Sequence, residues 1–531
     1  MKLPIDLEAI AHARQLAAQV AAPLLAYFGR HSTVAIERAV LRLLGIDGVD
    51  SAGVPWPNRV VDRLQANGQI ARGVALPLAE VALQTGLTLP EAALLIAEDQ
   101  ATSPDELSKV ALTAAAAPRQ LIMEQANRCL ADLQARRAER SRLRAELGLG
   151  TEPWKYVIVA TGNIFEDVPQ AVLAARQGAD IIAVIRSTAQ SLLDYVPFGH
   201  TTYGTGGTYA TGANFRLMRQ ALDEVGQEQG RYIQLTNYAS GLCMPEITVL
   251  ALQEGLDMLL NDALYGVLFR DINFYRTLTD QNFSRQLSGW GGIVINTGED
   301  NYLTTADAFA EGHTVLASQF INERFAWEAK MSSRLIGLGH AFEIDPAMED
   351  GLLYEIAMAQ LVRQIFPDSP IKWMPPTKHV TGNIFTTFAH QTLFNLVGAL
   401  TSQSIELLGM LTEAIHTPFA ADRYLALKNA SYTFQFARHL AGEINWQPDG
   451  RIAQRAGQVL AEAVALLERI AEEGLVNAIQ RGAFANIVRM PDGGKGFAGN
   501  FERAADYLNP FEILLAESGG PARASGLPAR S

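Results

Sequence analysis

Residues 180–214 read DIIAVIRSTAQSLLDYVPFGHTTYGTGGTYATGAN, and this stretch decides the fold. Its start, 181–185, is apolar and rich in β-branched residues and lacks the polar face of an amphipathic helix, so it predicts a parallel strand buried on both faces. The strand runs directly into Arg186 and the hydroxyl-rich residues 187–191, and a guanidinium beside hydroxyls suits an anion. A strand that ends in a ligand-binding loop is typical of barrel enzymes.

Further apolar segments after residue 150 have the length and composition of buried strands. Helical patterns such as VPQAVLAARQGA at 168–179 lie between them, and this alternation of strand and helix indicates a parallel sheet or closed barrel. The predicted strands are 156–160, 180–186, 231–237, 256–262, 292–298, 340–345 and 371–374. An eighth strand would close the ring, and 396–400 is its candidate. We therefore predict an α/β fold built on a (β/α)8 barrel, with helical N-terminal and C-terminal extensions.

The chain divides into four predicted segments: a helical extension over 1–150, the barrel over 151–400, a second helical extension over 401–518 and a disordered tail over 519–531. The first extension carries several helix signals. Asp6 is a predicted N-cap, Ser103 to Glu106 has the pattern of a capping box, and a helix beginning near Pro118 should continue into a run of arginines. The glycines and prolines of 45–58 predict a loop.

Composition narrows the class of protein. The 531 residues include 43 lysines and arginines against 56 acidic residues, for a formal charge of −13, which argues against nucleic acid or an anionic membrane as the main partner. Only Cys129 and Cys243 are present, and the chain starts without the pattern of a secretory signal. Since no apolar run approaches the roughly 20 residues that span a bilayer, we expect a cytoplasmic protein.

Polar residues follow the ends of several predicted strands, where barrel enzymes place their active sites. Arginine and serine suit a phosphate group, a tyrosine suits stacking on a flat ring, and an aspartate with a lysine suits a zwitterionic amino acid. These strand-end residues are Arg186, Ser191, Asn237, Ser240, Asp262, Tyr265, Arg270, Glu299, Asp300, Asn301 and Lys372. The histidines at 200, 313, 340, 379 and 390 have no metal-ligand spacing, so no metal site is predicted.

Two glycine-containing motifs complete the barrel segment. YGTGGTYATG at 203–212 matches neither of the common phosphate-loop patterns and is interpreted as a mobile or close-packed lid. TGNIF occurs at 161–165 and again at 381–385, each time shortly after a predicted strand. The repeat is interpreted as two similar strand-to-helix turns, with chance as the alternative.

Long words of this sequence resemble the large subunit of the lysine 5,6-aminomutase family, over nearly the whole chain. The words are TVAIERAVLRLLGIDGVD, IIAVIRSTAQSLLDYVPFG, TTYGTGGTYATGANFR, LTNYASGLCMPE, LNDALYGVLFRDIN, INTGEDNY and PIKWMPPTKHVTGNIF. The resemblance implies an enzyme that uses adenosylcobalamin and pyridoxal 5′-phosphate (PLP). Its reaction moves the terminal amine of D-lysine or L-β-lysine to the neighbouring carbon, in lysine fermentation.

The resemblance also implies roles for individual residues. Asp300 and Lys372 would bind the amino and carboxylate groups of the substrate. Tyr265 would face the PLP ring and act as the catalytic residue. The implied PLP contacts are Arg186, Ser187, Thr188, Ala189, Gln190, Ser191, Ser240, Tyr265, Arg270 and Asn301.

A partner subunit is implied by what the sequence lacks. No histidine stands in the DxHxxG motif of cobalamin enzymes that displace the cofactor's own base, so the cobalt ligand must come from elsewhere. In the family, a smaller beta subunit carries the cobalamin domain and the Schiff-base lysine. We therefore expect an α2β2 assembly in which this chain is inactive alone.

Three alternatives remain open at the level of sequence. An ornithine 4,5-aminomutase-like large subunit would take a substrate one methylene shorter, a difference worth only ~1–3 kcal/mol in an apolar slot. A cobalamin-free barrel enzyme could bind a phosphorylated substrate with the same arginine and serines. A non-catalytic scaffold could display a ligand-binding barrel.

Overall fold

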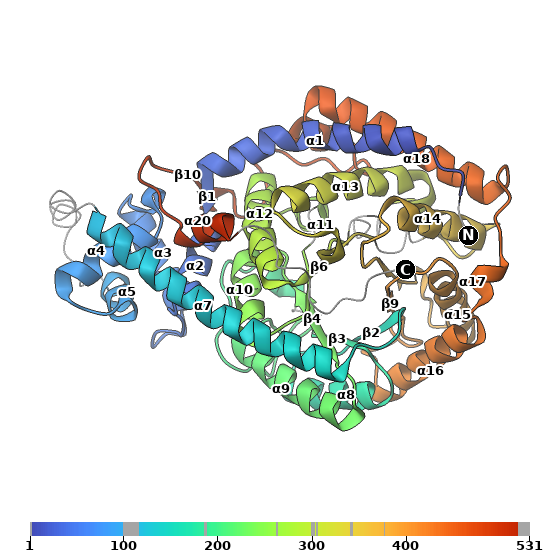
Figure 1. The fold of residues 1–531 in the computed structure, drawn as a ribbon, viewed down its shortest axis with the longest axis horizontal. Helices are drawn as coiled ribbons and strands as arrows, with labels where there is room; N and C mark the ends of the chain where they lie inside the picture. Colours follow the sequence, from blue (N-terminus) through green and yellow to red (C-terminus); the bar gives the residue numbers. More distant parts are fainter. Residues whose placement is uncertain are drawn as a thin grey trace.

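The computed structural model describes residues 3–98, 116–184, 188–261, 264–298, 303, 306–339, 344–375 and 377–518. Eight short parallel strands form a barrel that is closed almost completely, inside a ring of helices (Figure 1). The strands are β2 (Trp154–Ile158), β3 (Ile181–Ala183), β4 (Gln234–Tyr238), β5 (Met258–Leu260), β6 (Val294–Asn296), β7 (Ile336–Gly337), β8 (Lys372–Trp373) and β9 (Ile405–Leu407). The predicted (β/α)8 barrel is confirmed.

Strand order follows the chain around the ring, as β7-β6-β5-β4-β3-β2-β9-β8. Between β7 and β8 the described residues form no ladder, and close packing joins the two strands instead. Glycine permits this approach, because a Cβ on Gly339 would lie 2.6 Å from Cγ2 of Ile371. A hydrogen bond of 3.0 Å from the Leu338 amide to Ser369 Oγ ties the two ends together. The barrel is thus closed by side-chain and backbone packing at this seam.

Two predicted strands were wrong. The sixth barrel strand, β7, lies at 336–337 and not at 340–345, of which 340–343 fall outside the described residues and 344–345 are not strand. The stretch 396–400 is the last turn and a half of a helix that begins at Ile384, and the strand that completes the barrel follows at 405–407. A short apolar run has the same composition at a buried helix end as in a buried strand, which explains the error. The last strand therefore lies just past the predicted barrel boundary at residue 400.

The outer ring consists of helices that pack side by side in chain order. α8 packs on α9, α9 on α10, α10 on α12, α14 on α15 and α15 on α16, and α16 returns to pack on α8. The ring helices are α8 (Ile164–Arg176), α9 (Gly212–Gln229), α10 (Met244–Glu254), α12 (Phe274–Gly291), α13 (Ala308–Glu328), α14 (Gly351–Ile365), α15 (Ile384–Leu400) and α16 (Ala420–Phe436). A short helix, α11 (Leu264–Leu268), precedes α12.

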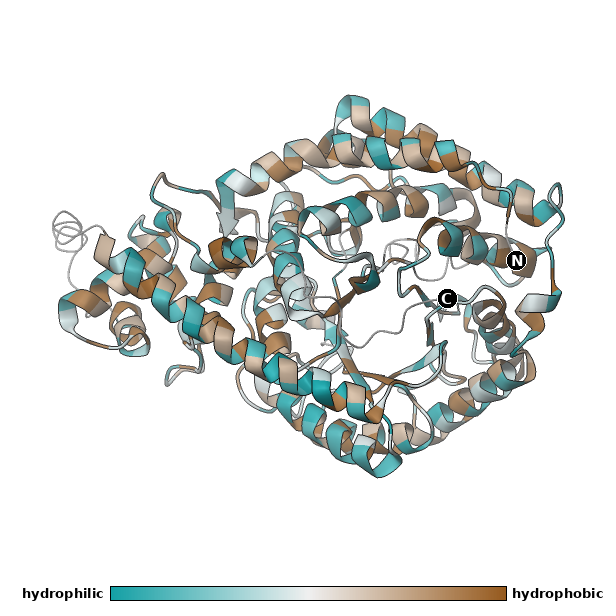
Figure 2. Ribbon diagram, in the orientation of Figure 1, coloured by the Kyte–Doolittle hydropathy of each residue, from teal (hydrophilic) through white to brown (hydrophobic). Residues whose placement is uncertain are grey.

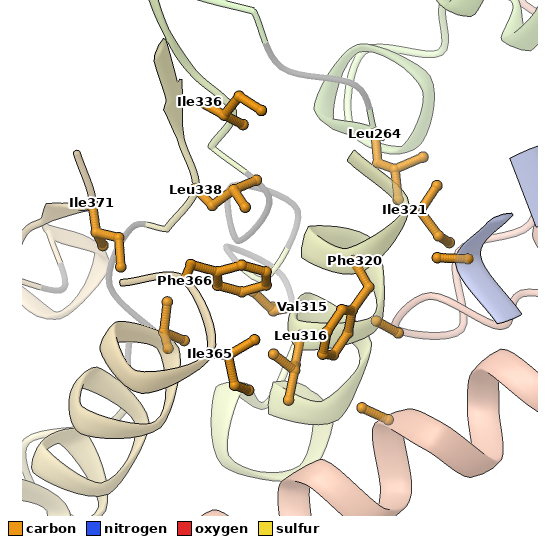
Figure 3. Close-up of a cluster of buried hydrophobic side chains, with 14 of the residues drawn as sticks. Leu264, Val315, Leu316, Phe320, Ile321, Ile336, Leu338, Ile365, Phe366 and Ile371 are labelled. Carbon is orange, nitrogen blue, oxygen red and sulfur yellow. The ribbon is translucent and has the colours of Figure 1, made fainter. Parts of the chain in front are cut away.

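Apolar side chains fill the space between the strands and the ring helices. Figure 3 shows Val315, Leu316 and Phe320 of α13 facing Ile365 and Phe366 at the end of α14. All five side chains are buried. This layer fixes α13 and α14 against β7 and β8, the two strands that share no ladder.

The N-terminal extension contains α1 (Leu7–Arg30), β1 (His31–Thr33), α2 (Val34–Leu43), α3 (Trp56–Ala66), α4 (Ala75–Thr85), α5 (Leu89–Ala97) and α7 (Ala116–Leu147). Within it, α2 to α5 form a lobe beside the barrel, drawn in blue in Figure 1, whereas α1 packs on α13 and α18 (Arg451–Glu473) and α7 crosses the barrel. Asp6 caps α1 as predicted, by accepting from the amides of Glu8 and Ala9. The predicted capping box at 103–106 lies outside the described residues.

The C-terminal segment returns to this lobe. It contains α17 (Leu440–Glu443), α18 (Arg451–Glu473), α19 (Leu475–Gln480), β10 (Asn500–Glu502) and α20 (Pro510–Glu517). β10 pairs antiparallel with β1. The prediction that residues 1–150 are helical throughout is therefore wrong at β1. α18 packs against α1, α13 and α14, which places the two long helices together above the barrel in Figure 1. The predicted tail at 519–531 lies outside the described residues.

Long α7 crosses the face of the barrel that holds the amino ends of the strands. Its predicted arginine run is helical, and Figure 2 shows hydrophilic and hydrophobic residues interspersed along the whole helix. Arg144 and Arg219 form ion pairs with Asp257, a fully buried carboxylate just before β5. Burial raises the pKa of Asp257, but the two arginines outweigh it and the pKa is lowered. Arg144 belongs to α7, so its ion pair with Asp257 holds this helix to the barrel.

Within the described ranges no helix is long and apolar enough to cross a bilayer.

Candidate active site

A cavity of about 560 Å³ opens at the carboxyl ends of the strands. Ile158 ends β2, Tyr238 ends β4 and Leu407 ends β9, and all three line it. Tyr265 and Phe269, from the helix after β5, form another wall. The volume falls in the range of small-molecule sites, which are mostly apolar with a few fixed polar groups. The cavity is therefore the candidate active site.

Tyr265 and Arg270 act as one unit at this cavity. Nε of Arg270 donates to the Tyr265 hydroxyl at 3.1 Å, and the Arg270 guanidinium lies 5.4 Å from the centre of the Tyr265 ring. The ring of Phe269 stacks on Tyr265 at 5.1 Å with an interplanar angle of 17°. The stack and the guanidinium hold the tyrosine ring in one orientation, as the prediction of a flat ring-binding surface requires.

The described part of the predicted phosphate loop lies against the loop that follows β4. Thr188–Leu192 form a short 3-10 helix, in which Gln190 and Ser191 are buried. Gln190 exchanges two hydrogen bonds with the backbone of Ala210, of 3.0 and 2.8 Å. The Leu242 amide donates to the Ser191 carbonyl at 3.1 Å. Ser240 is buried two residues before Leu242, so the structure brings the predicted Ser191 and Ser240 regions together.

Glycine at position 241 makes this approach possible. Its φ is +86°, and a Cβ there would lie 2.4 Å from the carbonyl oxygen of Ser191. Any side chain would push the two loops apart, because that distance is far below van der Waals contact. Gly241 therefore sets how closely Ser240 approaches the 188–192 segment.

Lys372 lies inside the barrel and is fully buried on β8. Its ammonium is 5.5 Å from the centre of the Tyr156 ring, which belongs to β2. Burial and the neighbouring Tyr238 raise the pKa of the Tyr156 hydroxyl, and its hydrogen bond with Thr236 lowers the pKa by less. The pKa therefore lies well above the ordinary value. Lys372 thus lies inside the barrel beside Tyr156, and it is not among the residues that line the cavity.

Several predicted residues cannot be placed. Arg186, Ser187, Asp262, Glu299, Asp300 and Asn301 lie outside the described residues, as does the side chain of Thr188. Ala189 is half-buried within the 3-10 helix. In the part of the chain that the structure describes, no three histidine, cysteine, aspartate or glutamate side chains are grouped as metal ligands would be.

Comparison with known proteins identifies the family. The model of the family described as the D-lysine 5,6-aminomutase TIM-barrel domain of the alpha subunit matches residues 3–514. The chain belongs to this family. It is 51% identical to the lysine 5,6-aminomutase alpha subunit of Acetoanaerobium sticklandii over 97% of this chain and 98% of that protein. The alpha subunit from Fusobacterium nucleatum is also 51% identical, over 97% of this chain and 99% of its own.

A more distant relative has a different name. The D-ornithine 4,5-aminomutase subunit beta of Acetoanaerobium sticklandii is 27% identical over 66% of this chain and 49% of that protein. The match to the family model and the two identities of 51% confirm the resemblance to the lysine 5,6-aminomutase family, and with it the barrel fold.

The site of this aminomutase family member contains a residue that the sequence prediction missed. Glu413 lines the cavity, and its Oε2 accepts a hydrogen bond of 3.2 Å from the Met410 amide. Its Oε1 is buried and has no hydrogen-bond partner among the described residues. Burial outweighs the Met410 hydrogen bond and raises the pKa of Glu413 to about 7. Placing the last strand at 405–407 would have revealed Glu413 as a strand-end residue.

The glycine motifs have clear structural roles. TGNIF forms two equivalent turns, because Asn163 caps α8 and Asn383 caps α15. The predicted pair of strand-to-helix turns is confirmed. Gly204 of the YGTGGTYATG segment packs against Gly162 of the first turn, where a Cβ would lie 3.2 Å from Cα of Gly162. This contact supports the close-packed interpretation of the segment.

Proposed function

We propose that this chain is the catalytic large subunit of an adenosylcobalamin- and PLP-dependent aminomutase. Its reaction moves the terminal amino group of D-lysine or L-β-lysine from C6 to C5. The observation that carries the proposal is the cavity at the strand ends, with its aromatic wall of Tyr265 and Phe269 and with Arg270 donating to the Tyr265 hydroxyl. The 51% identity to two lysine 5,6-aminomutase alpha subunits supports lysine over ornithine as the substrate.

The residues of the cavity fit PLP. Tyr265, backed by Phe269, offers a flat face to a pyridine ring, and Ser191 and Ser240 come from loops that touch each other. Arg186 and its neighbours would complete the phosphate contacts, with Asn301 as a further contact. When bound, PLP supplies the group that carries the migrating nitrogen during the radical rearrangement.

The chain itself binds, orients and shields. Leu407, Leu408 and Met410 give the cavity apolar walls, which keep water from a reactive radical. Lys372 would hold the substrate carboxylate, and Asp300 its ammonium group. These contacts fix the carbon chain while the terminal amine moves.

A smaller beta subunit would complete the enzyme. We propose that it brings the cobalamin domain, the cobalt ligand and the Schiff-base lysine, in an α2β2 complex located in the cytoplasm. Lys378 supports this division of labour, because its ammonium donates to the carbonyls of Leu303 and Ala306. We propose that the chain is organised as a helical extension over 1–150, the barrel over 151–400 with its last strand just beyond residue 400, a second helical extension over 401–518 and a tail over 519–531.

Reconstitution tests the proposal. The chain would be co-purified with its small subunit and supplied with PLP, adenosylcobalamin and D-lysine, L-β-lysine or D-ornithine. Mass spectrometry should detect diaminohexanoate from a lysine isomer only when both cofactors and both chains are present. Borohydride reduction should fix PLP to the small subunit and not to this chain.

Three outcomes would contradict the proposal. Faster turnover of D-ornithine would favour the ornithine enzyme, and turnover without cobalamin would favour a barrel enzyme of another kind. A complex in which Asp300→Asn retains full kcat/KM would indicate a scaffold or another substrate-binding mode, because a substrate-binding carboxylate should contribute strongly.

A further inference from the structure

We propose that Glu413 binds the ammonium group of the substrate that stays in place during the reaction. The inference deepens the proposed function and rests on it, since it assigns a specificity-determining residue to the same cavity. Glu413 was not among the residues that the sequence pointed to.

The composition of the cavity wall carries the inference. Among the described residues that line it, Glu413 is the only carboxylate, and most of the others are apolar or aromatic. The cationic Arg423 also lines the wall, but its Nε donates to the Ile158 carbonyl at 2.9 Å and its Nη1 contacts Gln170. Glu413 Oε1 has no such partner in the described part of the chain. A buried acceptor without a donor indicates a site that a ligand completes.

The substrate supplies the missing donor. Lysine carries two ammonium groups, and only one of them migrates. An ammonium has three N–H donors, so a hydrogen bond to Glu413 leaves two donors for other groups such as the predicted Asp300. In an apolar cavity this charge-assisted hydrogen bond is stronger than in water.

Neighbouring strands place the two charges that such a head group needs. β8 carries Lys372, and β9, which leads to Glu413, pairs with β8 through Lys372 and Ile405. The carboxylate of a D-amino acid is attached to the same carbon as its ammonium. Lys372 is the first residue of β8, and Glu413 lies in the turn six residues after β9, so the two side chains come from neighbouring segments of the barrel.

The charge state of Glu413 supports the same assignment. Burial raises its pKa to about 7, so the empty site holds a mixture of carboxyl and carboxylate near neutral pH. Tyr238, Tyr265 and Arg423 are the other titratable groups on the described wall, and His416 nearby has its Nδ1 at 2.8 Å from the Thr417 carbonyl. A bound ammonium would favour the carboxylate and release a proton.

The experiment compares two ligands on the reconstituted complex. D-Lysine has the stationary ammonium, and 6-aminohexanoate lacks it but keeps the carboxylate and the terminal amine. Calorimetry would give Kd for both ligands in the wild-type complex, in Glu413→Gln and in a control, Glu502→Gln, which changes an exposed residue of β10. In Glu413→Gln, Kd for D-lysine should rise about 10- to 100-fold while Kd for 6-aminohexanoate stays within about twofold.

Each result bears on the proposal. An equal loss for both ligands, or no loss for either, would overturn it. Failure of the wild-type complex to bind D-lysine would instead contradict the proposed function. If the Glu413→Gln complex does not assemble, the pH dependence of ligand binding to the wild-type complex tests the inference instead. As pH falls below about 7, the carboxylate is lost and D-lysine should bind up to about tenfold more weakly per pH unit, with no such change for 6-aminohexanoate. Parallel pH curves for the two ligands would overturn the inference.

Discussion

Asp194 Oδ1 lies 2.8 Å from Nη2 of Arg276, an arginine with no exposed surface, and Arg38 donates to the same oxygen. Arg276 belongs to α12 of the barrel ring, and Arg38 belongs to α2 of the N-terminal lobe. Asn58 of α3 adds a hydrogen bond of 2.9 Å to the Asp194 carbonyl. Since Asp194 lies two residues after the 3-10 helix that contains the described part of the predicted phosphate loop, the N-terminal lobe fixes one end of that loop.

Asp194→Asn should therefore weaken PLP binding as well as stability. Burial raises the pKa of Asp194, but Arg276 and Arg38 outweigh it and the pKa is lowered, so the carboxylate is the form that the arginines hold. We expect a loss of at least ~1 kcal/mol of stability and a PLP Kd about tenfold higher, because the loop loses its anchor. An absorbance titration of the complex and its Tm would measure both.

A matched variant separates the two effects. Asp506→Asn removes an exposed ion pair with Arg72 in the N-terminal lobe. It should leave PLP binding unchanged. If both variants lower PLP affinity equally, Asp194 has no special role at the loop.

Gly241→Ala should disturb the same loop from its other side. The new Cβ would meet the Ser191 carbonyl oxygen at 2.4 Å, at a φ of +86°. Gly230→Ala is the control, because φ is +62° there with open space around it. Both should lose about 1 kcal/mol from backbone strain, but only Gly241→Ala should raise the PLP Kd by about tenfold. Equal PLP affinity in the two variants would contradict the role assigned to this contact.

The Tyr265 ring should matter more than its hydroxyl. Tyr265→Phe keeps the stack on Phe269 and removes the 3.1 Å hydrogen bond from Arg270. We expect a PLP Kd about threefold higher for Tyr265→Phe and at least about tenfold higher for Tyr265→Ala, which loses the flat surface. The same absorbance titration measures both, and a larger loss for the phenylalanine variant would refute this ranking.

Sequence predicted the barrel well where a distinct apolar run contains the strand. Such runs marked β2 and β4, with five residues each, and also β3, β5, β6 and β8, with two or three. β7 and β9 are as short, and for each of them the prediction falls on another apolar segment nearby, 340–345 or the end of α15. Glu413 was missed for this reason, since its significance depends on where the last strand ends.

Contacts between distant segments could not be predicted from local patterns. β1 pairs with β10 across the length of the chain, and Arg38 reaches Asp194 from a different lobe. By contrast, Tyr265 and Arg270 are five residues apart, and a 3.3 Å hydrogen bond from the Arg270 amide to the Tyr265 carbonyl closes the turn between them, so their contact is local. Contacts among the predicted site residues therefore follow from sequence only where one loop or turn supplies both partners.

The two TGNIF turns should contribute equally to stability. Asn163 accepts from the Phe165 amide at 3.1 Å, and Asn383 accepts from the Phe385 amide at 3.2 Å. Asn163→Ala and Asn383→Ala should each cost about 1 kcal/mol, and serine at either position should recover most of it, since serine also caps helices. Thermal unfolding of the variants measures this. A serine variant as unstable as the alanine variant would show that the side-chain cap is not what the motif provides.

Glu37 should make stability fall as pH rises from about 4.5 to 7. Burial raises its pKa to about 7, more than the hydrogen bonds from the Val74 amide, Ser32 and Tyr507 lower it. A carboxyl whose folded pKa exceeds its unfolded value stabilises the protein below the unfolded pKa, and this contribution is lost through the folded pKa. Glu37→Gln does not titrate, so its Tm deficit against the wild type should be largest near pH 5 and shrink towards pH 8. A deficit that widens with pH would mean that Glu37 is buried as a stable carboxylate between α2 and the C-terminal segment.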